Sequence, residues 1–133
     1  MRRHASPRLD LLDGKAILVA EDDPIVQRVL VRLISHLGTE PTVVPDGAAL
    51  AHALANQRFS LVISDVKLPG RSGIEVVIER RRLADETPVL LLTGDPEGVE
   101  EQVAGIPGVA LFAKPFVASE LRAGILSAIG IPL

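Results

Sequence analysis

The chain has 133 residues, 47% of them hydrophobic and 23% charged, a balance that is typical of one globular domain and excludes a disordered chain. Its formal net charge of −3 includes no block of like charges, so the charge pattern does not point to nucleic acid or to a membrane surface. The chain has no cysteine, which excludes disulfides and thiolate metal sites, and no apolar run near the ~18 residues of a membrane span, so we expect a cytoplasmic protein.

Five short apolar runs alternate with five helical patterns along the chain. The runs are nearly continuous in apolar residues, as expected for strands that helices cover on both faces. Strand–helix alternation with short connections predicts parallel strands joined by right-handed crossovers. We therefore predict an α/β fold, a flavodoxin-like doubly wound sandwich with a five-stranded parallel sheet in the order 2-1-3-4-5 and five helices. The predicted strands are residues 16–20, 42–44, 61–64, 89–92 and 109–112.

Capping residues indicate where the helices begin and end. Asp23 stands before a proline, a pair that is typical of the N-cap and first position of a helix, and Gly38 is typical of a helix end. Asp46 and Ser72 could cap the second and third helices in the same way. The fifth helix is expected to begin near Ser119.

Three segments are less regular. Residues 96–104 show a weak helical pattern with a glycine inside it. The run Glu-Arg-Arg-Arg at 79–82 is most simply the solvated face of the third helix. We assign residues 1–13 to an N-terminal arm or linker and residues 14–133 to the domain.

Chemically useful side chains stand at the carboxyl ends of four predicted strands, where doubly wound folds bind ligands. Glu21 and Asp22 follow the first strand, and Asp65 follows the third. Thr93 follows the fourth strand, and Lys114 follows the fifth. The fold is expected to bring these carboxylates, this hydroxyl and this ammonium together at one edge of the sheet.

This ordered set resembles the receiver domain of two-component response regulators, and the resemblance covers roughly residues 15–131. It implies that Asp65 accepts a phosphoryl group, while Thr93 and Lys114 bind phosphoryl oxygens. A cis peptide bond after Lys114 is also implied. The chemistry suits these residues, because a carboxylate can attack an anionic phosphoryl group only where opposite charges offset the repulsion.

The resemblance also implies a divalent metal, usually Mg²⁺. Its ligands would be the side chains of Glu21, Asp22 and Asp65 and the backbone carbonyl of Lys67. Without the metal, clustered carboxylates repel one another, and the pKa of at least one of them should rise.

Two positions depart from the receiver pattern. Many receivers carry an aromatic switch residue three positions before the lysine, where this chain has Leu111; Phe112 follows and, by strand alternation, should face the other way. The usual aromatic signal toward the fourth helix, fifth strand and fifth helix is therefore in question. At the rim of the site, Lys67 and Asp95 either pair across the mouth and slow hydrolysis or act as two independent solvated charges.

The implied function is a phosphoacceptor switch, not an enzyme acting on a separate substrate. Its donor would be a histidine kinase or histidine phosphotransfer protein, and its downstream protein is unknown. The chain would be a stand-alone receiver or a receiver cut from a hybrid histidine kinase or larger regulator. A degenerate receiver that only binds partners should lack Asp65 or Lys114, and both are present. A flavin binder would need a glycine-rich phosphate loop where the acidic residues follow the first strand.

Overall fold

The computed structural model describes residues 9–131 and contains a five-stranded sheet in the order β2-β1-β3-β4-β5. Every pair of neighbouring strands is parallel, which confirms the predicted topology. The strands are β1 (Ile17–Ala20), β2 (Thr42–Val44), β3 (Leu61–Asp65), β4 (Val89–Thr93) and β5 (Val109–Ala113).

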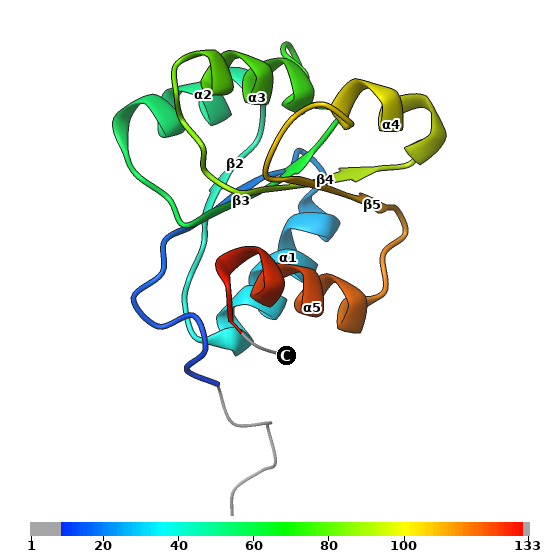
Figure 1. The fold of residues 1–133 in the computed structure, drawn as a ribbon. Coiled ribbons are helices and arrows are strands. Elements are labelled where there is room, and N and C mark those ends of the chain that lie inside the picture. The colour runs from blue at the N-terminus through cyan, green and yellow to red at the C-terminus, as the bar shows by residue number, and fades with distance from the viewer. Residues whose placement is uncertain (1–8, 132–133) are drawn as a thin grey trace, which may run out of the picture.

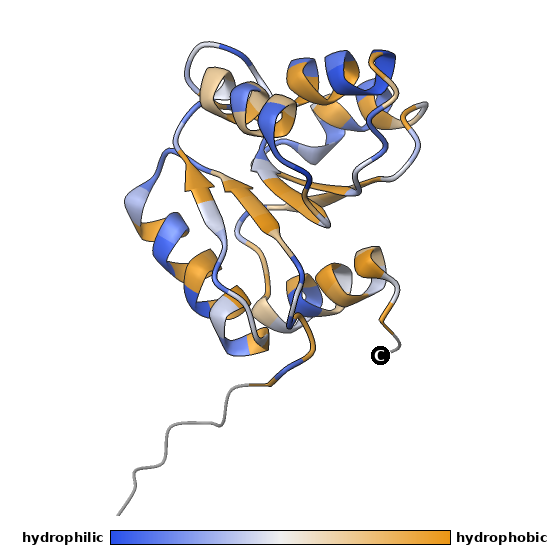
Figure 2. Cartoon of the chain, turned by 90° about the vertical axis from the view of Figure 1, so that its left-hand side faces the viewer, coloured by the Kyte–Doolittle hydropathy of each residue, from blue (hydrophilic) through white to orange (hydrophobic). Residues whose placement is uncertain are grey.

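Helices cover the two faces of the sheet unequally, as Figure 1 shows. α1 (Pro24–Leu37) and α5 (Ala118–Ile129) lie on one face, and α2 (Gly47–Asn56), α3 (Gly73–Arg82) and α4 (Pro96–Val103) lie on the other. The hydropathy colouring of Figure 2 shows apolar strands between these two helical layers. Among residues 9–131, no helix is both long enough and apolar enough to cross a bilayer.

The predicted caps are confirmed at three helix starts. The side chains of Asp23, Asp46 and Ser72 each accept a hydrogen bond from a backbone N–H in the first turn of their helices. The weak segment does form α4, which Asp95 caps through the N–H of Gly98. α5 begins at residue 118 without a side-chain cap, so its predicted start near residue 119 is confirmed within one residue.

Strand alternation divides the buried apolar residues into two clusters, one on each face of the sheet. Leu111 packs with the cluster beneath α2, α3 and α4, whereas Phe112 packs with the cluster beneath α1 and α5. The prediction that these two side chains face opposite ways is therefore confirmed.

Residues 9–13 lie against the end of α1. Leu12 is fully buried, and its N–H donates to the carbonyl of Leu37 at 2.9 Å; the N–H of Leu9 donates to the carbonyl of His36 at 2.8 Å. Part of the predicted arm thus contributes to the core, while residues 1–8 lie outside the described residues. The division between an arm at 1–13 and a domain at 14–133 stays a prediction.

A polar corner connects the end of α3 to β4 and to the loop before β5. Arg81 donates to the carbonyls of Asp85, Thr87 and Pro107 at 2.9 to 3.1 Å, and Arg80 pairs with the Asp85 carboxylate at 3.0 Å. The prediction that residues 79–82 form only a solvated face was wrong for these two arginines. The direction in which these two side chains point depends on the path of the loop after α3, because that loop supplies most of their partners.

Protonation of Asp85 at low pH should remove part of the stability that the polar corner provides. Burial alone would raise the pKa of Asp85, but hydrogen bonds from Thr87 and Arg80 outweigh it and lower that pKa. A lowered pKa in the folded state adds stability above the unfolded pKa, and this stability is lost as pH falls through the folded value. We expect Asp85→Asn to destabilise the protein at pH 7 and the difference from wild type to shrink below about pH 4. Urea unfolding of both proteins at several pH values measures it, and a difference independent of pH would contradict it.

Candidate functional site

The parallel sheet brings the ends of β1, β3, β4 and β5 to one edge, and three predicted site residues meet there through direct contacts. Nζ of Lys114 lies 2.9 Å from Oδ2 of Asp65 and 3.0 Å from Oε1 of Glu21. These residues are 49 and 93 positions from Lys114 in the chain. The lysine side chain therefore bridges two buried carboxylates, one just after β1 and one at the end of β3.

Three carboxylates surround a common point at this edge. Glu21, Asp22 and Asp65 each offer an oxygen, and these oxygens all lie within 4.8 Å of one another. Glu21 and Asp65 are buried, whereas Asp22 is exposed, so the cluster has one side open to solvent. Hard divalent cations such as Mg²⁺ prefer carboxylate oxygen together with retained water. The donor set therefore fits the predicted metal.

The pKa values at this cluster reflect burial and the contact of one ammonium with two buried carboxylates. Burial raises the pKa of Glu21, although the N–H of Asp23 and the ammonium of Lys114 oppose the rise. Burial alone would lower the pKa of Lys114, but its hydrogen bonds to Asp65 and Glu21 outweigh this and raise it. The predicted rise in the pKa of one clustered carboxylate therefore occurs at Glu21, but burial is its main cause and repulsion from Asp65 is a smaller one.

Thr93 connects the ends of β4 and β5 beside the cluster. Its carbonyl accepts the N–H of Lys114 at 2.7 Å, and its Oγ1 accepts the N–H of Asp95 at 3.0 Å. The side chain is buried at the edge where Asp65 ends β3. The peptide bond between Lys114 and Pro115 is cis, as the resemblance implied.

The two rim residues have separate contacts. Lys67 is exposed, and its backbone N–H donates to Oδ1 of Asp65 at 3.3 Å. The carboxylate of Asp95 caps α4. The ion pairs described within residues 9–131 do not include Lys67 with Asp95. Of the two interpretations of the sequence, the structure therefore matches the one in which Lys67 and Asp95 are independent charges.

Three residues that support the site were not predicted from the sequence. The amide of Gln27 donates to the carbonyl of Glu21, and the hydroxyl of Ser64 donates to the carbonyl of Asp65 at 2.8 Å. Gly73, the first residue of α3, lies so close to β3 that a Cβ there would come within 2.5 Å of the Asp65 carbonyl oxygen. A glycine directly after a capping serine was the only sequence signal for this close approach.

We expect Gly73→Ala to disturb the site. The added methyl would overlap the Asp65 backbone, and overpacking of this kind typically costs about 1 to 3 kcal/mol. Because the overlap is with the backbone of Asp65 itself, we expect its chemistry to slow as well as the fold to weaken. Urea unfolding measures the first effect, and the rate of covalent modification at Asp65 measures the second.

Gly105→Ala is the matched control. A Cβ on Gly105 meets no heavy atom within 4 Å, and its φ is not in the left-handed region. The control should therefore change stability by less than about 0.5 kcal/mol. Equal losses in the two variants would mean that the close approach to Asp65 does not matter.

The comparisons with known proteins point to one family. The family model described as response regulator receiver domain matches residues 17–126. An uncharacterized transcriptional regulatory protein of Bacillus subtilis, YkoG, is 36% identical over 115 residues, which are 85% of this chain and 50% of YkoG. Response regulator MprA of Mycobacterium sp. (strain KMS) is 37% identical over 109 residues, 80% of this chain and 47% of MprA. The chain spans about half the length of these curated relatives.

Solved structures agree as well. The receiver domain of sensor histidine kinase PA1611 from Pseudomonas aeruginosa, described with a magnesium ion coordinated in its active site cleft, matches with a TM-score of 0.79 at 29% identity, over 88% of this chain and 98% of that one. The Francisella response regulator 1452 receiver domain has the same TM-score at 23% identity, over 87% and 97% of the two chains, and shows the likeness of fold. With the family model matched over most of its length, the chain belongs to the response regulator receiver domain family.

Proposed function

We propose that this receiver domain is a phosphorylation switch in which Asp65 accepts a phosphoryl group from a histidine kinase or histidine phosphotransfer protein. The observation that carries the proposal is the contact of 2.9 Å between Nζ of Lys114 and Oδ2 of Asp65, beside the three clustered carboxylates. This arrangement places a fixed positive charge at a buried carboxylate on the edge of the sheet.

Mg²⁺ is the proposed cofactor. Glu21, Asp22 and Asp65 would hold it through side-chain oxygens, and the backbone carbonyl of Lys67 is proposed as a further ligand. When bound, the cation neutralises charge on the reacting oxygens. The PA1611 receiver, which is described with a magnesium ion coordinated in its active site cleft, supports the same assignment here.

The transfer step forms a bond between an Asp65 oxygen and phosphorus while the phosphorus–nitrogen bond to the donor imidazole breaks. The imidazole nitrogen keeps the electron pair of that bond and takes a proton from solvent. Lys114 offsets the negative charge of the phosphoryl oxygens, and the hydroxyl of Thr93 donates a hydrogen bond to one of them. The contact of Lys114 with Asp65 orients the carboxylate before the donor arrives.

The phosphorylated domain differs from the free domain mainly in its charge. A phosphoryl group adds about −1.5 to −2 charges at one point, enough to bias a surface that has two arrangements. We propose that an unidentified protein reads this surface in the cytoplasm, without direct contact between this domain and nucleic acid. The net charge of −3 supports the last point. The relatives and structural neighbours include a transcriptional regulatory protein and a sensor kinase, and these support the proposal that the switch operates in one of these two settings.

Intact mass spectrometry tests the proposal directly. The protein is incubated with acetyl phosphate, a small donor, in the presence of Mg²⁺ or of excess EDTA. We expect wild type to gain one phosphoryl group only with Mg²⁺, and Asp65→Asn to gain none. A phosphorylated Asp65→Asn protein, or wild type that stays unmodified, would remove Asp65 from its proposed role.

A further inference from the structure

Gln27, near the start of α1, reaches back across the turn that connects β1 to α1. Its side-chain amide donates to the carbonyl of Glu21 at 2.6 Å, and its backbone N–H donates to the carbonyl of Asp23 at 2.9 Å. The paired residues of β1 end at Ala20, and the N–H of Glu21 makes one further bond to the carbonyl of Val44 on β2. The Glu21 carbonyl is therefore held by a side chain of α1 instead of by a neighbouring strand.

Asp22 comes next in the chain, and the peptide units on both sides of it are fixed by hydrogen bonds. The Glu21 carbonyl and the Asp22 N–H belong to one planar peptide unit, so the contact with Gln27 fixes the orientation of this unit. The following unit contains the N–H of Asp23, which donates to Oε2 of Glu21 at 3.1 Å. Because each residue has only two soft backbone dihedral angles, fixing both units fixes the direction in which the Asp22 side chain leaves the backbone.

The carboxylate of Asp22 depends on its backbone more than the other two carboxylates of the cluster do. Those of Glu21 and Asp65 are each held directly by Nζ of Lys114, at 3.0 and 2.9 Å. Asp22 is exposed, and its carboxylate accepts no hydrogen bond from any residue between 9 and 131. Its oxygen nevertheless lies within 4.8 Å of an oxygen of each of the other two. The turn between β1 and α1 is therefore what keeps this carboxylate in the cluster.

We propose that Gln27 is a positioning residue of the cation site, which orients the Asp22 carboxylate by holding the Glu21 carbonyl and thereby sets the affinity for a divalent cation. The inference deepens the proposed function, because it rests on Mg²⁺ as the cofactor. Removing a partner that orients a metal ligand typically lowers metal affinity by about 10- to 100-fold. Gln27 acts on Asp22 through the backbone only, so we expect the lower end of this range, about tenfold.

Binding of Mn²⁺ to the protein, measured by electron paramagnetic resonance, tests the inference without any phosphoryl donor. Mn²⁺ is the probe because it takes the same oxygen ligands as Mg²⁺. Gln27→Met keeps the length and the helix propensity of the side chain but removes its donor. We expect the dissociation constant for Mn²⁺ to rise by about tenfold. An unchanged constant would overturn the inference and leave the proposed function standing, whereas wild type that binds no Mn²⁺ would contradict both the inference and the proposed cofactor.

Gln102→Met is the matched control. Gln102 is exposed near the end of α4, and its side-chain amide also donates to a backbone carbonyl, that of Gly98 at 3.1 Å. The same substitution therefore removes the same kind of hydrogen bond from a helix that carries none of the three carboxylates. We expect this control to bind Mn²⁺ as wild type does. Equal weakening in the two variants would overturn the role assigned to Gln27.

A double-mutant cycle with Asp22→Asn shows whether Gln27 acts through Asp22. Asparagine keeps the shape of the side chain but not its charge, so Asp22→Asn alone should weaken Mn²⁺ binding more than Gln27→Met does. Once this ligand is impaired, its orientation matters little, and adding Gln27→Met should raise the dissociation constant by less than about twofold. A second loss as large as that of Gln27→Met alone would assign the effect to another ligand and overturn the inference.

The Mg²⁺ dependence of phosphorylation separates positioning from a purely structural role. A buried carbonyl that loses its donor destabilises the fold under either role, so urea unfolding alone does not distinguish them. With acetyl phosphate, Gln27→Met should need about tenfold more Mg²⁺ for its half-maximal rate. At saturating Mg²⁺ its rate should come within about twofold of wild type, because Asp65, Thr93 and Lys114 are unchanged.

A lower rate at saturating Mg²⁺ with the same half-maximal concentration would overturn the inference. Wild type that takes no phosphoryl group would contradict the proposed function, and the Mn²⁺ affinities would still decide the role of Gln27.

Discussion

Phosphorylation of Lys114→Met by acetyl phosphate is expected to be slower than that of wild type by a factor of about 100 to 1000, the typical effect of removing one preorganised electrostatic group. Methionine keeps the length and apolar stem of lysine but cannot bind phosphoryl oxygens. In the present structure, Nζ of Lys114 is the positive group in direct contact with Asp65. The rate of mass gain at a fixed Mg²⁺ concentration measures the effect.

The same substitution should also destabilise the fold when Mg²⁺ is absent. Removing the ammonium leaves two buried carboxylates, Glu21 and Asp65, without their common partner. Breaking a buried pair typically costs about 3 to 5 kcal/mol, and we expect about 2 to 3 kcal/mol here because the lysine side chain keeps contact with solvent. Added Mg²⁺ should recover stability in the variant more than in wild type, since a bound cation offsets the same charges.

Asp65→Asn is the informative comparison for Lys114→Met. It should abolish phosphorylation, whereas Lys114→Met should only slow it. It also removes a negative charge from beside Glu21, so its stability should stay within about 1 kcal/mol of wild type. If both variants lost the same stability in urea unfolding, the cause would be general disruption of the site. If Lys114→Met were phosphorylated at the wild-type rate, the lysine would have no part in the chemistry.

The ends of the strands are the part of the site that the sequence predicted well. In a parallel sheet, carboxyl ends lie at one edge, so Glu21, Asp65, Thr93 and Lys114 had to meet once the topology was known. The order of the strands and the polar residue at the end of each were sufficient to predict this meeting, and the positions of individual side chains were not needed. The caps at Asp23, Asp46 and Ser72 were predicted for a similar reason, because each depends on its own helix alone.

The missed features depend on contacts between distant segments. Leu12 looked like part of a linker, because nothing near it in the chain shows that it packs beneath the end of α1. The role of Gly73 comes from its close approach to Asp65, which only the packed structure shows. Asp95 was assigned to the rim of the site, whereas its carboxylate caps α4, a role available only once that helix forms.

Arg81→Met is expected to lower the free energy of unfolding by about 3 kcal/mol, because three backbone carbonyls lose their donor together. The guanidinium of Arg81 donates to the carbonyls of Asp85, Thr87 and Pro107, and so connects α3, the loop before β4 and the loop before β5. Burial lowers the pKa of Arg81, which Asp85 and Glu86 oppose. The cation is therefore partly withdrawn from solvent, and its hydrogen bonds are screened less than those of a surface arginine.

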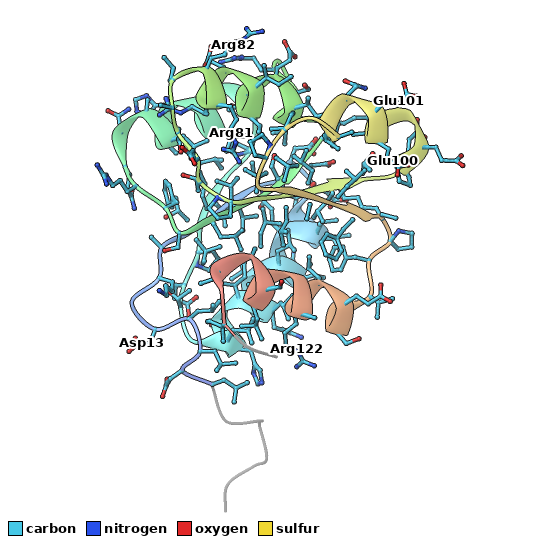
Figure 3. All side chains as sticks on the ribbon, viewed as in Figure 1. Asp13, Arg81, Arg82, Glu100, Glu101 and Arg122 are labelled. Atoms are coloured by element: carbon cyan, nitrogen blue, oxygen red, sulfur yellow. The ribbon has the colours of Figure 1, made fainter. Side chains whose placement is uncertain are left out.

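Arg81→Lys and Arg82→Met separate the causes of this loss. A lysine ammonium keeps the charge but lacks the planar fork that reaches several carbonyls at once, so Arg81→Lys should recover less than half of the loss. Arg82 follows on the same helix and points outward in Figure 3, so Arg82→Met should change stability by less than about 0.5 kcal/mol. Urea unfolding of the three variants gives the order, with Arg81→Met the least stable.

If Arg81→Lys were as stable as wild type, charge alone would explain the role of Arg81. If Arg82→Met lost as much stability as Arg81→Met, the loss would come from removing any arginine of this helix. The hydrogen bonds of Arg81 to the two loops would then have no special part in the stability of the fold.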